Sequence, residues 1–245
     1  MIVLLTIKST LNKFDIYAAL LCAVLFYCEA AICQKGKVIY TNDASISSHF
    51  QKIKQKNKIE YLKYKKLAEY EMDLMKKIEY ELIFNEQESI FKVIEKKNVD
   101  EEINMIYKSE GIFYKNTDEN ICFIKKRFSN YSIDLMQIKW EIQEDTKSIL
   151  GYKCKKAIGY KTDKKNNTFL EDRAEAWFCP AIKHSYGPLG FSNLPGIILQ
   201  LDYKSYHLLA KEIIFSDKIK LSKPNFNSKK ISEIQFSKIM KDKFN

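Results

Sequence analysis

The chain has 245 residues, of which 46% are hydrophobic and 29% charged, and this composition excludes a wholly disordered protein. The net charge of +10 would suit nucleic acid, anionic lipid or acidic glycan as a partner. Only Arg127 and Arg173 are arginine, the residue that recognises phosphate through two parallel hydrogen bonds, so we interpret the charge as a solvated lysine surface.

The first 33 residues have the pattern of a signal peptide. Lys8 and Lys13 precede an apolar run, Ile16–Cys28, which is too short to span a bilayer. Small residues follow it, and Ala31-Ile32-Cys33 predicts cleavage before Gln34. Two alternatives stay open: lipidation of Cys33, which the preceding Ile32 disfavours, and an uncleaved anchor, which the length disfavours. We expect an exported protein of the periplasm or outer envelope, or a secreted one, with no nucleic-acid partner.

The next hundred residues predict strands around one helix. Lys37–Thr41 is typical of an opening strand, and residues 58–77 carry apolar residues at helical spacing, which predicts an amphipathic helix packed on a sheet. From position 78 the period changes to two, and residues 78–84 and 89–94 predict a β-hairpin. A charged loop is expected at 95–104 and a second hairpin at 112–128, with its turn at 116–120.

Residues 139–143 predict another strand, and residues 152–178 a long hairpin with a polar tip at 163–168. Counting outward from the tip places Cys154 opposite Cys179. A disulfide between them would need Cβ atoms within about 4.5 Å, and a slip of one residue would separate them, so bridged and free thiols both stay open. There is no C-x-x-C spacing, and the three histidines match no metal pattern, so we expect neither metal nor cofactor.

Three glycines and two prolines lie within ten residues at 187–196, in a chain with only seven glycines and four prolines. Leu194-Pro195-Gly196-Ile197 predicts a type II turn, in which proline presets φ and glycine supplies a positive φ. Residues 197–203 and 206–215 then predict paired strands, and a lysine-rich tail begins near 222. No linker divides residues 34–245, which indicates one domain of mainly β (α+β) class. We expect an antiparallel sheet, which could be curved or bowl-like, with the amphipathic helix packed on it.

Three ordered blocks of this sequence resemble the GLPGLI family of exported proteins from Bacteroidetes-type bacteria. The first block has matching residues at Trp140, Lys147, Gly151, Tyr152, Cys154, Lys156 and Ala157. Ala176–Pro180 is the second, and the naming motif matches at Gly187, Pro188, Phe191, Leu194, Pro195, Gly196 and Leu199. Asn193, Ile197 and Gln200 depart from the motif, and Cys179 stands where the family often has threonine. The resemblance implies export and a β-rich fold; the family has no established activity.

We expect a non-enzymatic binding or assembly module of the cell envelope. Trp140, Trp177, Tyr186 and Phe191 are its candidate aromatic platform, for a glycan, a peptide, or a periplasmic or outer-membrane protein. A hydrolase is one alternative: His184 with Ser185 or Cys179 could supply nucleophile and base, or Asp172 and Glu175 paired carboxylates. A protein that binds anionic lipid or lipopolysaccharide is the other.

Overall fold

One sheet of twelve strands dominates the part of the chain that the computed structural model describes, which is residues 35–42, 58–126, 129–163, 168–225 and 228–244. Residues 35–245 cluster as one unit, and the expected signal peptide lies outside the described residues. The strands are β1 (Gly36–Asn42), β2 (Glu79–Phe84), β3 (Glu88–Val93), β4 (Gly111–Asn116), β5 (Ile121–Lys126), β6 (Tyr131–Asp134), β7 (Gln137–Ile149), β8 (Tyr152–Asp163), β9 (Thr168–Cys179), β10 (Ile197–Tyr203), β11 (Tyr206–Phe215) and β12 (Lys229–Ser232).

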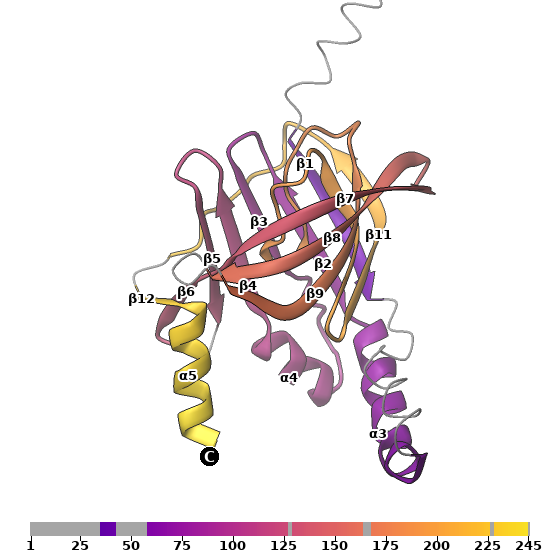
Figure 1. Ribbon diagram of the computed structural model, residues 1–245, viewed down its shortest axis with the longest axis vertical. Coiled ribbons are helices and arrows are strands. Elements are labelled where there is room, and N and C mark those ends of the chain that lie inside the picture. The colour runs from indigo at the N-terminus through magenta and orange to yellow at the C-terminus, as the bar shows by residue number, and fades with distance from the viewer. Residues whose placement is uncertain (1–34, 43–57, 127–128, 164–167, 226–227, 245) are drawn as a thin grey trace, which may run out of the picture. The chain divides into compact units, whose positions relative to one another are not determined.

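The order of the strands is β12-β6-β5-β4-β3-β2-β1-β11-β10-β9-β8-β7, and every neighbouring pair is antiparallel except β12 with β6. The first strand therefore lies inside the sheet, between β2 and β11. The sheet curls strongly, so that β7, β8 and β9 cross in front of β2–β5 (Figure 1). This is the mainly β, antiparallel fold that the period-two pattern predicted.

Side chains fill the inside of the curl. The main core draws on both halves of the sheet and is rich in aromatic rings, among them Tyr40, Tyr80, Phe91 and Phe178, each at most 2% exposed. Tyr40 joins β1 to β10 across the intervening β11, because its hydroxyl donates to the carbonyl of Ile198 over 2.6 Å. A smaller apolar cluster of Ile124, Ile133 and Ile231 lies at the β12 edge.

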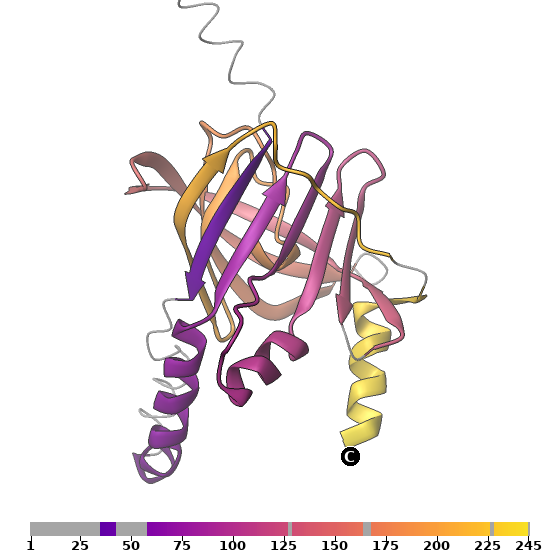
Figure 2. The same ribbon diagram turned by 180° about the vertical axis from the view of Figure 1, so that it is seen from behind.

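Three helices accompany the sheet (Figures 1 and 2). Helix α3 (Lys58–Lys76) packs on it near its C-terminal end through Leu74. The preceding part of the helix extends past the ends of β1 and β2. Four apolar residues of this part are therefore exposed: Ile59, Leu62, Leu67 and Tyr70. Helix α5 (Glu233–Phe244) follows β12, and its Phe236 and Ile239 pack against the smaller cluster.

Helix α4 (Glu101–Ser109) lies where the sequence predicted the end of a charged loop, and that part of the prediction is wrong. Glu101 and Glu102 begin it, which suits the positive end of a helix dipole. Ile103 and Tyr107, one turn apart, are buried in the core, and their burial stabilises the helix.

The long hairpin has the register that counting predicted. Lys155 of β8 pairs with Phe178 of β9, so the next position along each strand places Cys154 opposite Cys179. Strand β7 pairs on the other side of β8, with Lys147 opposite Cys154. Leu150 and Gly151, with φ of 51° and 81°, make the two-residue turn between β7 and β8, the type I′ geometry typical of tight hairpins.

The turn at 194–197 differs from the predicted type II turn. Gly196 N–H donates to the Leu194 carbonyl over 2.8 Å, which makes a three-residue turn centred on Pro195. Ile197 N–H donates to the Ile182 carbonyl over 3.1 Å instead of to Leu194. The positive φ predicted for Gly196 is present at 155°, and a Cβ there would lie 2.1 Å from the carbonyl oxygen of Cys179.

Candidate functional site

The structure distributes the four candidate aromatic residues over different environments. Trp140 and Phe191 lie together, with ring centroids 6.0 Å apart, and Trp140 Nε1 donates to the Ser192 carbonyl over 2.7 Å. Tyr186 is 1% exposed and donates its hydroxyl to the Glu86 carbonyl over 3.1 Å. These residues pack in the core, so they do not form one exposed platform with Trp177.

Trp177 lies beneath two lysines: Lys147 Nζ is 4.2 Å and Lys156 Nζ 5.6 Å from the ring centroid. Both ammonium groups are within the range of a cation–π contact, which occupies the face of the ring that an aromatic ligand would need.

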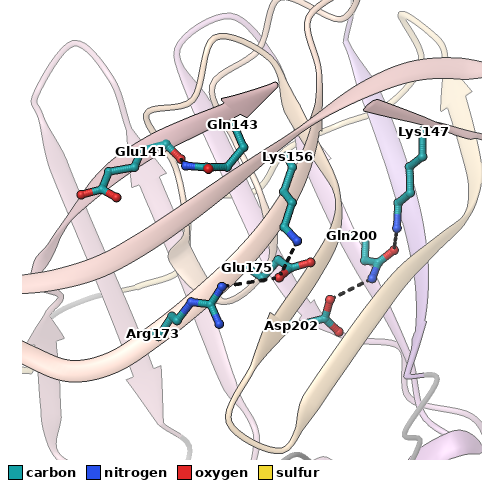
Figure 3. A network of polar contacts seen from close by, with 8 residues as sticks. All are labelled: Glu141, Gln143, Lys147, Lys156, Arg173, Glu175, Gln200 and Asp202. Carbon is teal, nitrogen blue, oxygen red and sulfur yellow. Dashed lines mark hydrogen bonds and ion pairs between the residues drawn. The ribbon is translucent and has the colours of Figure 1, made fainter. Parts of the chain in front are cut away.

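The lysines over Trp177 belong to a polar network across β7–β10 (Figure 3). Lys147 donates to the side-chain oxygen of Gln200, and Gln200 Nε2 donates to Asp202 over 2.8 Å. Lys156 pairs with Glu175 at 3.1 Å. Burial raises the pKa of Asp202, but hydrogen bonds from His207 and Gln200 outweigh it and leave the pKa below its usual value. The polar side chains of the network contact one another, so few of their hydrogen-bonding groups remain to bind a ligand.

The glycine- and proline-rich residues act as scaffold. Segment 180–196 runs along the start of β10. The carbonyl of Tyr186 accepts a hydrogen bond from the N–H of Ile198 in β10, at 2.9 Å. Gly187 lies against Ile198, Pro188 begins a short 3₁₀ turn (Pro188–Gly190), and Leu194 is 1% exposed. The segment therefore fills and shapes the inside of the curled sheet.

A cavity of about 240 Å³, the inner pocket, opens between the two halves of the curled sheet and helix α5. Its walls combine apolar side chains from β4–β6, segment 180–196, β10, β11 and α5 with a few charged groups. It is lined by Glu110, Gly111, Phe113, Ile124, Lys126, Ile133, Leu135, Lys161, Leu189, Phe191, Tyr203, Lys204, Tyr206, Glu233, Phe236 and Ser237. Of the candidate aromatic residues, Phe191 alone lines it.

Glu110 is a partly buried acid of the inner pocket. It caps the C-terminus of α4, and its carboxylate accepts hydrogen bonds from the hydroxyls of Tyr206 at 2.9 Å and Tyr80 at 3.3 Å. Burial raises the pKa of Glu110 above its ordinary value of 4.5, while the bond from Tyr206 and the charge of Lys126 lower it in part. Burial and the Glu110 charge also raise the pKa of Tyr80 and Tyr206, so both remain donors.

Three lysines line the inner pocket against two glutamates, a formal balance of +1. Lys161 donates to Glu233 and so joins β8 to α5; the second oxygen of Glu233 accepts from Met136 N–H over 3.1 Å. Among the described residues, Lys126 has no carboxylate within ion-pair distance. It also lines a neighbouring cavity of about 410 Å³ on the other side of Phe236. Lys126 is thus the cation best placed to meet an anion from solution.

A third cavity, of about 260 Å³, lies beside the turn at 194–196. His184 and Ser185 line it, but the His184 ring packs against Phe84, at 4.7 Å, and stacks on Tyr186. Cys179 lies against Cys154 instead of His184. The His184 ring is therefore packed among aromatic side chains, and Cys179 is next to the other buried thiol. Glu175 pairs with Lys156 and Arg173, and the side chain of Asp172 lies outside the described residues.

No family model matches the chain, and no curated protein matches it. Among the described residues, no helix is both long and apolar enough to cross a membrane, and no three His, Cys, Asp or Glu side chains gather as metal ligands would.

Sequence reasoning missed most of the inner pocket, namely Glu110, Lys126, Lys161, Tyr206, Glu233 and Phe236. One signal was available. Ala157, Gly159 and Lys161 are alternate residues of β8 and so lie on one face of the strand, with small residues at the first two positions. All three are buried, as is Ile158 on the other face. A lysine on the buried face of a strand indicates a paired charge or a ligand site.

Proposed function

We propose that this chain is an exported binding protein of the cell envelope, whose ligand is an amphiphile with an apolar body and an acidic group. The observation that carries this proposal is the inner pocket: apolar walls with a few convergent polar groups, the usual composition of a small-molecule site. An apolar body would replace water against Phe113, Ile133 and Leu135, and the acidic group would meet Lys126.

The size of the cavity restricts the ligand. At about 240 Å³ the inner pocket is below the usual range for ligand sites, about 300–1,000 Å³. A single acyl chain or a small aromatic acid suits it better than a lipid with several chains. Export and membership of the GLPGLI family are part of the same proposal, supported by residues 1–33 and by the ordered blocks at 140–199.

A fluorescence titration with cis-parinaric acid tests the proposal, with its methyl ester as the neutral comparison. We expect saturable binding of the acid and weaker binding of the ester. Lys126→Gln should weaken binding of the acid about tenfold, because a charge-assisted contact to a partly buried carboxylate is worth about 1.5 kcal/mol. The ester should bind this variant and the wild type alike.

Lys153→Gln is the matched control, since Lys153 lies exposed on β8, the strand that also carries Lys161. It removes the same charge and should leave both affinities unchanged. Equal affinity of acid and ester for the wild type would refute recognition of the acidic group, and no saturation with either probe would refute the site.

A further inference from the structure

Cys154 and Cys179 occupy opposed positions on β8 and β9, one residue beyond the paired Lys155 and Phe178. Opposed residues of an antiparallel pair have Cα atoms about 4.5–5.5 Å apart, within the range of about 4.4–6.8 Å that disulfides span. Both cysteines are 0% exposed, and both are free thiols in this structure. The fold therefore holds two sulfur atoms where they can join without a change of register.

The two thiols also interact chemically. The contact between them lowers the pKa of Cys179, against the opposite effect of burial, and the backbone N–H groups of Ile182 and Ala181 assist. The same contact, together with burial, raises the pKa of Cys154. The two thiol groups therefore lie against each other in the folded chain.

Cys122 provides the contrast within the same chain. Its Sγ lies 3.6 Å from the Gly190 carbonyl, and burial raises its pKa to about 12. It has neither a neighbouring thiol nor the environment of a reactive one among the described residues.

Cys179 is also the last residue before segment 180–196. Its carbonyl accepts from Ile182 N–H over 3.2 Å and is the atom against which Gly196 packs. A bond from Cys179 to β8 would therefore fix the start of the segment whose Leu189 and Phe191 line the inner pocket.

We propose that Cys154 and Cys179 form a disulfide that ties β8 to the base of segment 180–196, with Cys122 left as a free thiol. The oxidant is a disulfide-exchange reagent, such as the disulfide of an oxidoreductase or oxidised glutathione. The thiolate of one cysteine attacks one oxidant sulfur and releases a thiolate; the other cysteine then loses its proton, attacks the sulfur of the first and releases the second thiolate. Two electrons pass from the cysteines to the oxidant, and each of its sulfurs leaves as a thiol.

Burial of the two sulfur atoms determines the stage at which the disulfide can form. Both sulfurs are inaccessible in the folded chain, so we expect the bond to form while the protein folds and then to resist reductants. This inference goes beyond the proposed ligand, and its test uses no ligand.

The test is refolding of the reduced full-length chain in a mixture of oxidised and reduced glutathione. Remaining thiols are then alkylated with N-ethylmaleimide in denaturant, and the peptides are mapped without reduction. We expect one linked pair of peptides carrying Cys154 and Cys179, with Cys122 and the three cysteines of residues 1–33 alkylated. Hydrogen exchange in segment 180–196 should be slower in the oxidised than in the reduced wild type.

Three variants complete the test. Cys122→Ser should leave the linked pair unchanged, whereas Cys154→Ser and Cys179→Ser should each lose it and leave the remaining cysteine alkylated. Alkylation of Cys154 and Cys179 to the same extent as Cys122 in the wild type would overturn the proposal, as would a linked pair that contains Cys122. Far-UV circular dichroism confirms that each variant has folded.

Discussion

Gly196 permits a quantitative prediction, because the effect of a side chain there separates into two parts. The first is conformational: at φ +155° an L residue is strained, and leaving the allowed region costs about 1–2 kcal/mol. The second is steric. A Cβ at this position would lie 2.1 Å from the oxygen and 2.5 Å from the carbon of the Cys179 carbonyl, both backbone atoms that cannot rotate away. Overpacking of this kind costs about 1–3 kcal/mol.

A substitution at Gly151 measures the conformational cost without the steric one. Its φ is also positive, at 81°, but a Cβ there would meet nothing within 4 Å. We therefore expect Gly151→Ala to lower the free energy of unfolding by about 1 kcal/mol and Gly196→Ala by about 3 kcal/mol. For a domain of this size, 3 kcal/mol corresponds to a fall in melting temperature of about 6–12 °C.

Urea unfolding followed by tryptophan fluorescence measures both variants, since Trp140 and Trp177 lie on β7 and β9, close to the two glycines in the chain. The reasoning fails if the two substitutions cost the same within about 0.5 kcal/mol, because the clash with Cys179 would then contribute nothing.

Two further predictions concern the walls of the inner pocket. The pKa of Glu110 is raised by folding, so the folded state holds its proton more tightly than the unfolded state, and stability should fall as pH rises from about 4.5 through the raised pKa. Glu110→Gln removes this term: the stability of the wild type relative to the variant should decrease between pH 4 and pH 8, and a constant or increasing difference would contradict the assignment. Glu233→Ala should cost about 2 kcal/mol, since it leaves the mostly buried Lys161 without its partner. Adding Lys161→Met should recover part of that loss in urea unfolding, and no recovery would argue against the ion pair as the cause.

Local patterns predicted much of the sheet. The strands predicted at 78–94 and 197–215 were confirmed as β2, β3, β10 and β11, and burial alternates strictly along β2, whereas three consecutive residues are buried in β3 and in β10. The opposed positions of Cys154 and Cys179 followed from counting outward from a polar tip, and the pairs from Tyr160–Arg173 to Lys155–Phe178 have the counted register. Next to the tip, Asp163 pairs with Thr168, which is two residues off the counted register, and the shift between Tyr160 and Thr162 accounts for the difference.

The missed helix α4 and the inner pocket were harder for different reasons. At 101–109 the spacing of Ile103, Ile106 and Tyr107 is helical, but the preceding charges obscured it. The pocket depends on long-range topology. Glu110 meets Tyr206, and Lys161 meets Glu233, only because the sheet curls until β4–β6 face β8–β11. No local spacing encodes these meetings, and aromatic content alone pointed to Trp140 and Tyr186, which are structural.

The position of β1 has a consequence for biosynthesis. Strand β1 is synthesised early but cannot complete its pairing until β11 is synthesised, because residues 36–42 pair with residues 208–215 as well as with β2. Until β11 has left the ribosome, β1 has one unpaired side, and such distant contacts slow folding. The sheet therefore stays incomplete until almost the whole chain has been synthesised.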